Sequence, residues 1–63
     1  MTPAEPPDWA NWIAQDADGA FWAYEAEPNQ QDHGWYENEV GRIAPLGRTA
    51  PPADWRATLR RIR

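Results

Sequence analysis

The stretch WIAQDADGAFWAYEAEP, from Trp12 to Pro28, decides the fold because two short aromatic-rich runs flank a turn signal. Aromatic and β-branched residues favour strands, so residues 12–16 and 20–27 are expected to form two of them. The DADG between them suits a type I turn that Gly19 closes in a left-handed conformation, with a bulge. The stretch therefore predicts an antiparallel hairpin.

The turn also fixes which side chains share a face of the hairpin. In the bulged register one face carries Trp12, Ala14, Trp22, Tyr24 and Ala26, and the other carries Ile13, Gln15, Phe21, Ala23 and Glu25. A two-residue Asp18-Gly19 turn would pair Ile13 with Tyr24 instead and shuffle the faces. We favour the bulged register, because aspartate is a good first residue for a type I turn and Asp16 occupies that place.

Beyond Pro28, the sequence predicts one more strand and a helix. Alternation over residues 35–42 indicates a third strand, whereas residues 43–50 are expected to be irregular because they contain Pro45 and Gly47. The Pro51-Pro52 pair suits the first turn of a C-terminal helix over residues 52–62. Acid at the start of this segment and arginines at its end match the helix dipole. An apolar stripe at helical spacing is formed by Trp55, Leu59 and Ile62.

The expected fold class is therefore α+β: a three-stranded antiparallel β-meander with one C-terminal helix packed on the sheet. Residues 9–63 are expected to form this single small domain, and residues 1–8, rich in proline and acid, a flexible arm. With 63 residues and no cysteine, the chain has neither a disulfide framework nor a thiolate metal site. Five Trp, two Tyr and one Phe supply the expected core.

The net charge of −4 hides a strong segregation of sign along the chain. Residues 1–41 contain nine acids and no Lys or Arg, a charge of −9, whereas residues 42–63 contain six Arg and one Asp, a charge of +5. Such asymmetry points to the kind of partner that the protein binds. It also suggests that the two halves attract each other when folded.

The acids are expected to form a negative surface on neighbouring strands and turns. Such a surface repels nucleic acid and anionic membrane but attracts a basic protein surface and speeds encounter with it. Among basic surfaces in a cell, those of nucleic-acid-binding proteins are the strongest. The alternative is that the acids only keep a Trp-rich domain soluble. The predicted partner-binding residues are Glu25, Glu27, Glu37 and Glu39, assisted by Asp16, Asp18 and Asp32, with Trp35 and Tyr36 as aromatic anchors.

Other kinds of site fit the sequence less well. With Gly19 at the sixth position of a calcium loop, Asp16, Asp18 and Glu25 match later positions, but Ala14 would fill the first and cannot ligate. His33 is the only histidine, and no serine or cysteine nucleophile accompanies it. We therefore expect no enzyme activity, catalytic residue, cofactor or metal. The arginines complement a helix end, and a domain with pI near 4.6 is not expected to bind nucleic acid directly.

The pattern W-I-A-x-D-x-D-G-x-x-W-x-Y-x-x-x-P, followed by G-W-Y and D-W-R-x-T-L, resembles a type of small protein encoded by phages and prophages. It is carried by Trp12, Ile13, Ala14, Asp16, Asp18, Gly19, Trp22, Tyr24, Pro28, Gly34, Trp35, Tyr36, Asp54, Trp55, Arg56, Thr58 and Leu59. The shared motifs are structural and carry no chemistry. Many small phage accessory proteins block a host system by binding it, and anti-CRISPR proteins are among them.

The expected function is that of a small non-enzymatic phage-type inhibitor. It would bind the basic surface of a host nucleic-acid-handling protein or ribonucleoprotein complex, for example a CRISPR effector. A phage accessory or assembly subunit that self-associates is one alternative, and an aromatic module for carbohydrate or peptide is another. No apolar run approaches the roughly 20 residues of a membrane span, and the start lacks a signal-peptide pattern. A cytoplasmic monomer without membrane contact is expected.

Overall fold

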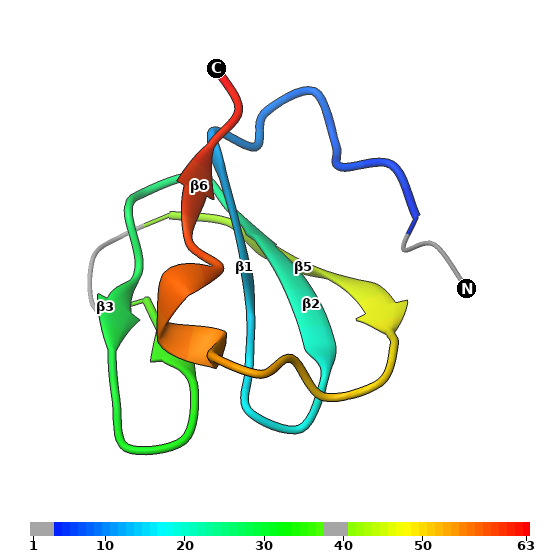
Figure 1. The fold of residues 1–63 in the computed structure, drawn as a ribbon. Helices are drawn as coiled ribbons and strands as arrows, with labels where there is room; N and C mark the ends of the chain where they lie inside the picture. The colour runs from blue at the N-terminus through cyan, green and yellow to red at the C-terminus, as the bar shows by residue number, and fades with distance from the viewer. Residues whose placement is uncertain (1–3, 38–40) are drawn as a thin grey trace.

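Residues 4–37 and 41–63 are described by the structure, a computed structural model. Within these ranges the chain forms six short strands and one 3-10 turn (Figure 1). The elements are β1 Trp12–Gln15, β2 Ala20–Tyr24, β3 Asn29–Gln30, β4 Trp35–Tyr36, β5 Ile43–Arg48, η1 Trp55–Ala57 and β6 Arg60–Arg61. Four strands form a sheet in the order β5-β2-β1-β6, and β3 pairs with β4 in a second sheet. All pairings are antiparallel. The α+β prediction is therefore wrong, because the described chain is nearly all β.

The central hairpin of β1 and β2 has the bulged register predicted from the sequence. Trp12 pairs with Tyr24 and Ile13 with Ala23 across the two strands. The Gly19 N–H donates to the Asp16 carbonyl at 3.0 Å, and Gly19 has a φ of 96°. A Cβ at this glycine would lie 2.1 Å from the Thr49 carbonyl oxygen, so both the backbone conformation and the packing require glycine here.

Strand β5 occupies the segment that the sequence predicts to be irregular. It pairs with β2, and the register skips Leu46, which forms a bulge between Pro45 and Gly47. Pro45 and Gly47 are tolerated because β5 is an edge strand, where a proline need not donate a hydrogen bond to a neighbouring strand and a glycine can lie at a bulge. Leu46 is buried, and its carbonyl accepts from the Ala4 N–H at 2.8 Å on the outer side of the strand.

The predicted helix over residues 52–62 is replaced by η1 and β6. Asp54 caps η1 by accepting from the Arg56 N–H at 3.2 Å. The chain then extends, and β6 pairs with β1 through Arg60–Ile13 and Arg61–Trp12 (Figure 1). A short isolated helix gains little by itself, whereas an extended segment here satisfies the open backbone groups of β1.

The predicted third strand, residues 35–42, is also wrong in extent. Only Trp35–Tyr36 is a strand, and it pairs with β3 rather than with the central hairpin. Residues 38–40 of that prediction lie outside the described residues. The place beside β2 is taken by β5. The Glu25 N–H extends this pairing by donating to the Arg42 carbonyl at 2.9 Å.

The buried core is made more of small aliphatic side chains than of tryptophan. Its cluster contains Ala10, Ile13, Ala23 and Leu46, with Trp9, Phe21 and Ile62 packed against it. Trp55 is the one tryptophan of the described chain that counts as buried; the other four are half-buried. The expectation of a tryptophan core is therefore only partly met. Ile13, Phe21 and Ala23 share one face of the β1–β2 hairpin, as the register predicts.

Candidate binding surface

The β3–β4 hairpin is attached to the end of β1 through Asp16. An Asp16 carboxylate oxygen accepts from the Trp35 N–H at 2.9 Å, and the next backbone N–H, of Ala17, donates to the His33 carbonyl at 3.0 Å. A Cβ at Gly34 would lie 2.7 Å from the same carboxylate oxygen. Gly34 therefore permits the close approach that positions the hairpin.

Trp35 is fixed inward from this hairpin, while Tyr36 points to solvent. The Trp35 indole donates to the Gln15 carbonyl at 3.1 Å and meets the Trp55 ring edge-to-face, with ring centroids 5.8 Å apart. This geometry is favourable for aromatic pairs. Tyr36 is 37% exposed. Of the two predicted anchors, Trp35 therefore supports the surface from within and Tyr36 is available to a partner.

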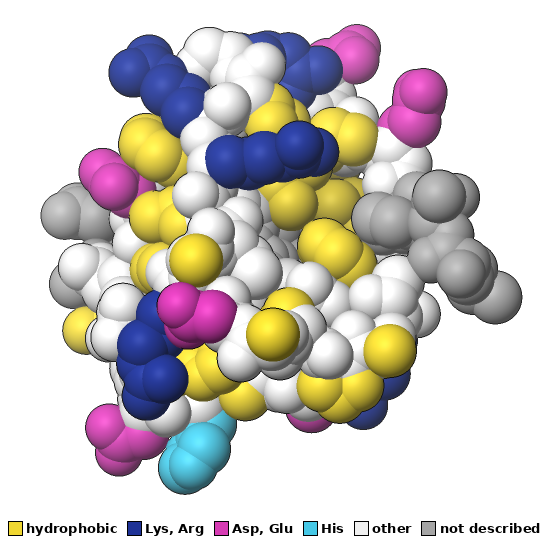
Figure 2. All heavy atoms as spheres, in the orientation of Figure 1, with side chains coloured by type: hydrophobic (Ala, Val, Ile, Leu, Met, Phe, Trp, Pro, Cys, Tyr) yellow, Lys and Arg dark blue, Asp and Glu magenta, His cyan; other side chains and the backbone are white. Residues whose placement is uncertain are grey.

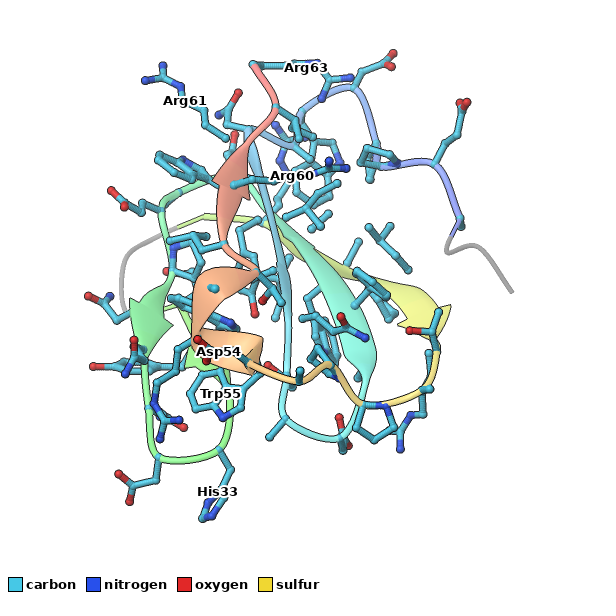
Figure 3. All side chains as sticks on the ribbon, in the orientation of Figure 1. His33, Asp54, Trp55, Arg60, Arg61 and Arg63 are labelled. Atoms are coloured by element: carbon cyan, nitrogen blue, oxygen red, sulfur yellow. The ribbon has the colours of Figure 1, made fainter. Side chains whose placement is uncertain are left out.

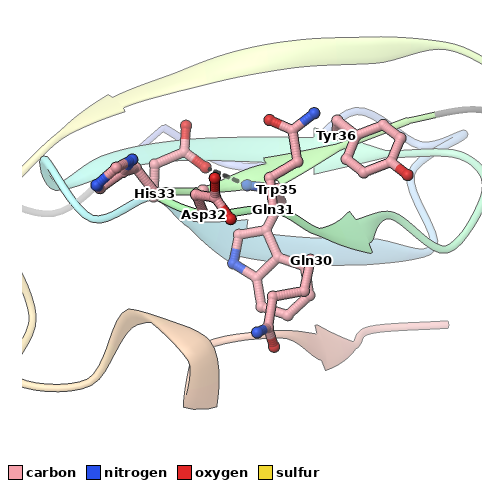
Figure 4. Close-up of a pocket in the computed structure, with 8 residues that line it drawn as sticks. Gln30, Gln31, Asp32, His33, Trp35 and Tyr36 are labelled. Atoms are coloured by element: carbon pink, nitrogen blue, oxygen red, sulfur yellow. Dashed lines mark hydrogen bonds between the residues drawn. The ribbon is translucent and has the colours of Figure 1, made fainter.

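A polar groove of about 690 Å³ runs along the hairpin (Figure 4). In Figure 4, Asp32 and His33 lie at the loop tip and the Trp35 indole points toward η1. The residues that line the groove are Asp16, Gln30, Gln31, Asp32, His33, Gly34, Trp35 and Tyr36. Its lining offers carboxylates, amides and an imidazole, the groups that hydrogen-bond polar or cationic side chains.

A second groove, which we call the aromatic groove, lies between the hairpin and the outer face of β2 and β5. Its volume is about 330 Å³. It is lined by Trp22, Tyr24, Trp35, Tyr36 and Ile43, together with the carboxylates of Asp16 and Glu37. The faces predicted for the β1–β2 hairpin place Trp22 and Tyr24 together, but no sequence pattern predicts that β4 and Ile43 enclose them.

Electrostatics in the aromatic groove favour positive charge. Burial, and after it the Asp16 carboxylate, raises the pKa of the Tyr24 phenol above its usual range. One carboxylate oxygen of Glu37 is buried and has no hydrogen-bond partner within the described residues. A buried acceptor without a donor is costly, and the carboxylate that carries this oxygen also lines the groove.

Two of the predicted binding acids are held in ion pairs. Glu25 receives hydrogen bonds from the Arg42 backbone N–H and guanidinium, with a closest ion-pair distance of 2.9 Å. These bonds lower the pKa of Glu25. Asp18 pairs with Arg48 at 3.2 Å and accepts from the Ala20 N–H. Ion pairs thus join the two halves of the chain, as expected. As a result, the carboxylates of Glu25 and Asp18 are no longer free to bind a partner.

The other predicted acids lie in three kinds of place. Asp16 is half-buried between the two grooves, and Glu37 lines the aromatic groove. Glu27 and Asp32 are exposed. Glu39 lies outside the described residues. Within residues 4–37 and 41–63 no arginine forms an ion pair with the acids Asp16, Glu27, Asp32 and Glu37.

The three arginines nearest the C-terminus lie at the other end of the molecule from His33, whereas Arg56 lies over the Trp55 ring. Figure 3 shows Arg60, Arg61 and Arg63 at the end where the chain terminates, and Figure 2 shows basic side chains there and others toward the histidine at the opposite end. Arg63 donates to the Pro7 and Ala10 carbonyls, and the Arg61 guanidinium lies 5.8 Å from the Trp12 ring centroid. The tail therefore does not cover the hairpin.

The described residues hold no group of three or more acidic or histidine side chains placed to bind a metal ion. Asp16, Asp18 and Glu25, the matches to a calcium loop, each have a different partner instead. No helix in the described part of the chain has the length and apolar character needed to cross a membrane. Compared with known proteins, the chain matches no family model, no curated protein and no solved structure.

Proposed function

We propose that this chain is a small non-enzymatic, phage-type inhibitor that binds a host nucleic-acid-handling protein complex, for example a CRISPR effector. Binding would use the acidic aromatic surface, defined as Asp16, Glu27, Asp32, Trp35, Tyr36 and Glu37. The observation that carries the proposal is the position of exposed Tyr36 beside carboxylates that no arginine of the described chain neutralises. Such a surface complements a Lys- and Arg-lined groove.

The strand edges support binding to a different protein over self-association. On β5, Pro45 lacks an N–H, and Ala4 already donates to the Leu46 carbonyl. On β6, the two residues are exposed arginines, which repel a second copy of the same edge. Proline, bulges and charge are the usual means by which sheet edges avoid pairing with another chain.

A charge-reversal variant tests the proposal. Glu27 and Asp32 are exposed and form no ion pair with the described arginines, so Glu27→Lys/Asp32→Lys should fold. Pull-down from host lysate at low salt should identify a basic nucleic-acid-binding partner, and high salt should release it. For the purified pair, the variant should associate about tenfold more slowly and with a weaker salt dependence.

The matched control reverses two acids elsewhere. Glu5→Lys/Asp8→Lys changes the net charge by the same amount, on exposed residues of the N-terminal segment. It should associate much faster than the Glu27/Asp32 variant. Equal rates for the two variants would mean that only net charge matters, and an unchanged rate for Glu27→Lys/Asp32→Lys would refute the acidic surface.

A further inference from the structure

The aromatic groove combines aromatic walls with carboxylates and contains no base. Trp22, Tyr24 and Trp35 supply rings, and Asp16 and Glu37 supply negative charge. No arginine of the described chain lines it. Aromatic faces attract cations through their quadrupole, and the attraction strengthens when the site is partly desolvated. The groove therefore has the chemistry of a site for an organic cation.

The same chain already binds its own guanidinium groups in this way. Arg42 lies with its guanidinium 4.9 Å from the Trp9 ring centroid while it donates to both carboxylate oxygens of Glu25. Arg56 lies 4.6 Å from the centroid of the Trp55 ring. A ring and a carboxylate around one guanidinium is thus an arrangement that this protein uses internally at Arg42, and Arg56 shows the ring contact alone.

We propose that the aromatic groove binds the side chain of an arginine presented by the partner, with its guanidinium between the aromatic rings and Glu37. This deepens the proposed function and rests on it, because it names the group by which the partner's basic surface is anchored. The Glu37 carboxylate, which lines the groove, would accept a guanidinium N–H in a charge-assisted hydrogen bond.

Arginine fits the groove better than lysine for physical reasons. Guanidinium is planar, stacks on aromatic faces and is more weakly hydrated than ammonium, so it loses less on entering an apolar-walled site. Tyr36 and Ile43, 37% and 50% exposed, stand at the mouth, where they can cover the methylene stem of the side chain. A volume of about 330 Å³ is at the lower end of ligand pockets and suits one side chain.

The test uses a single amino acid in place of the partner. N-acetyl-arginine amide is titrated into the full chain, and the indole N–H signals are followed by NMR. Trp22 and Trp35, which line the groove, should shift, whereas Trp9, already covered by Arg42, should not. The dissociation constant should be on the order of millimolar for so small a ligand. N-acetyl-citrulline amide, of the same shape but neutral, should give no such shift.

Two variants locate the site. Glu37→Gln keeps the shape but removes the charge and should weaken arginine binding about tenfold. Glu5→Gln removes an exposed charge outside both the groove and the acidic aromatic surface and should leave arginine binding unchanged. Equal binding of the citrulline and arginine amides, shifts confined to signals outside the groove, or full binding by Glu37→Gln would each overturn the inference.

These outcomes are separable from those of the proposed function. If arginine amide fails to bind but the partner still associates through Glu27 and Asp32 in a salt-dependent way, the groove assignment alone is wrong. If arginine amide binds the groove but no basic partner is captured, the site stands and the inhibitor proposal fails.

Discussion

At the scale of single residues, the structure divides acids that the sequence presents as one set. Glu25 is held by Arg42, Asp18 is paired with Arg48, and Asp16 has become a structural acceptor for the Trp35 N–H. Since an exposed ion pair contributes little to stability, the consequence of these pairs is mainly electrostatic: they remove negative charge from one part of the surface. Of the described acids predicted to bind a partner, the four without an arginine partner lie on or beside the β3–β4 hairpin: Asp16, Glu27, Asp32 and Glu37.

The Glu25–Arg42 contact predicts a pH dependence of stability. Hydrogen bonds from Arg42 lower the pKa of Glu25 in the folded state. Its contribution is therefore present above the ordinary glutamate pKa of about 4.3 and is lost as pH falls through the lowered value. Between about pH 6 and pH 3, the urea midpoint of Glu25→Gln should fall less than that of the parent chain. Glu27→Gln should follow the parent, and a Glu25→Gln profile identical to the parent's would contradict the prediction.

At the scale of elements, the C-terminal segment shows how tertiary contacts override a helical pattern. The Gln15 N–H donates to the Thr58 hydroxyl at 3.0 Å, and that hydroxyl lies 2.6 Å from the Trp55 carbonyl and 3.0 Å from the Gln15 carbonyl. Thr58 thus joins the end of η1 to β1. From this junction β6 runs along the open edge of β1, and the Ile62 N–H donates to the Asn11 carbonyl. Of the apolar residues expected to form a helical stripe, Trp55 packs against Trp35, and Ile62 packs against the buried core.

Removing the Thr58 hydroxyl should therefore loosen this whole element. Thr58→Val keeps the shape but leaves the Gln15 N–H without its acceptor, which should lower the free energy of unfolding by about 1–3 kcal/mol. Thr58→Ser retains the hydroxyl and should cost less. Urea unfolding followed by tryptophan fluorescence measures both variants. A valine variant as stable as the parent would show that this junction does not hold η1 to β1.

At the scale of the whole molecule, a 63-residue chain depends on a small core. Domains of this length typically have roughly 3–9 kcal/mol of stability, so one buried leucine matters. Leu46→Ala should lower the free energy of unfolding by about 2–5 kcal/mol, enough to unfold part of the population. Leu59→Ala, at a half-buried position, should cost less. Equal stability of the two variants in urea would mean that Leu46 is not part of the core.

The C-terminal arginines are also separated from the β3–β4 hairpin. Arginines of β6 and the C-terminus lie at one end, and the β3–β4 hairpin with Asp32 and His33 lies at the other (Figure 3). This separation follows from β6 pairing antiparallel to β1 rather than folding as a helix across the sheet. A partner attracted by the acidic aromatic surface can therefore approach without meeting the arginine tail.

The amino-acid sequence by itself determined the β1–β2 hairpin, its register and the left-handed Gly19, because these depend on turn chemistry and side-chain alternation within a few residues. It also indicated the acids and Tyr36 as candidates, though not which acids are free. Only the tertiary structure decided β5, β6 and the aromatic groove. Pro45 and Gly47 are acceptable in β5 solely because that strand is at an edge, and Arg60–Arg61 extend solely because β1 lacks a neighbour there. These choices depend on contacts between residues far apart in the chain, which local pattern does not encode.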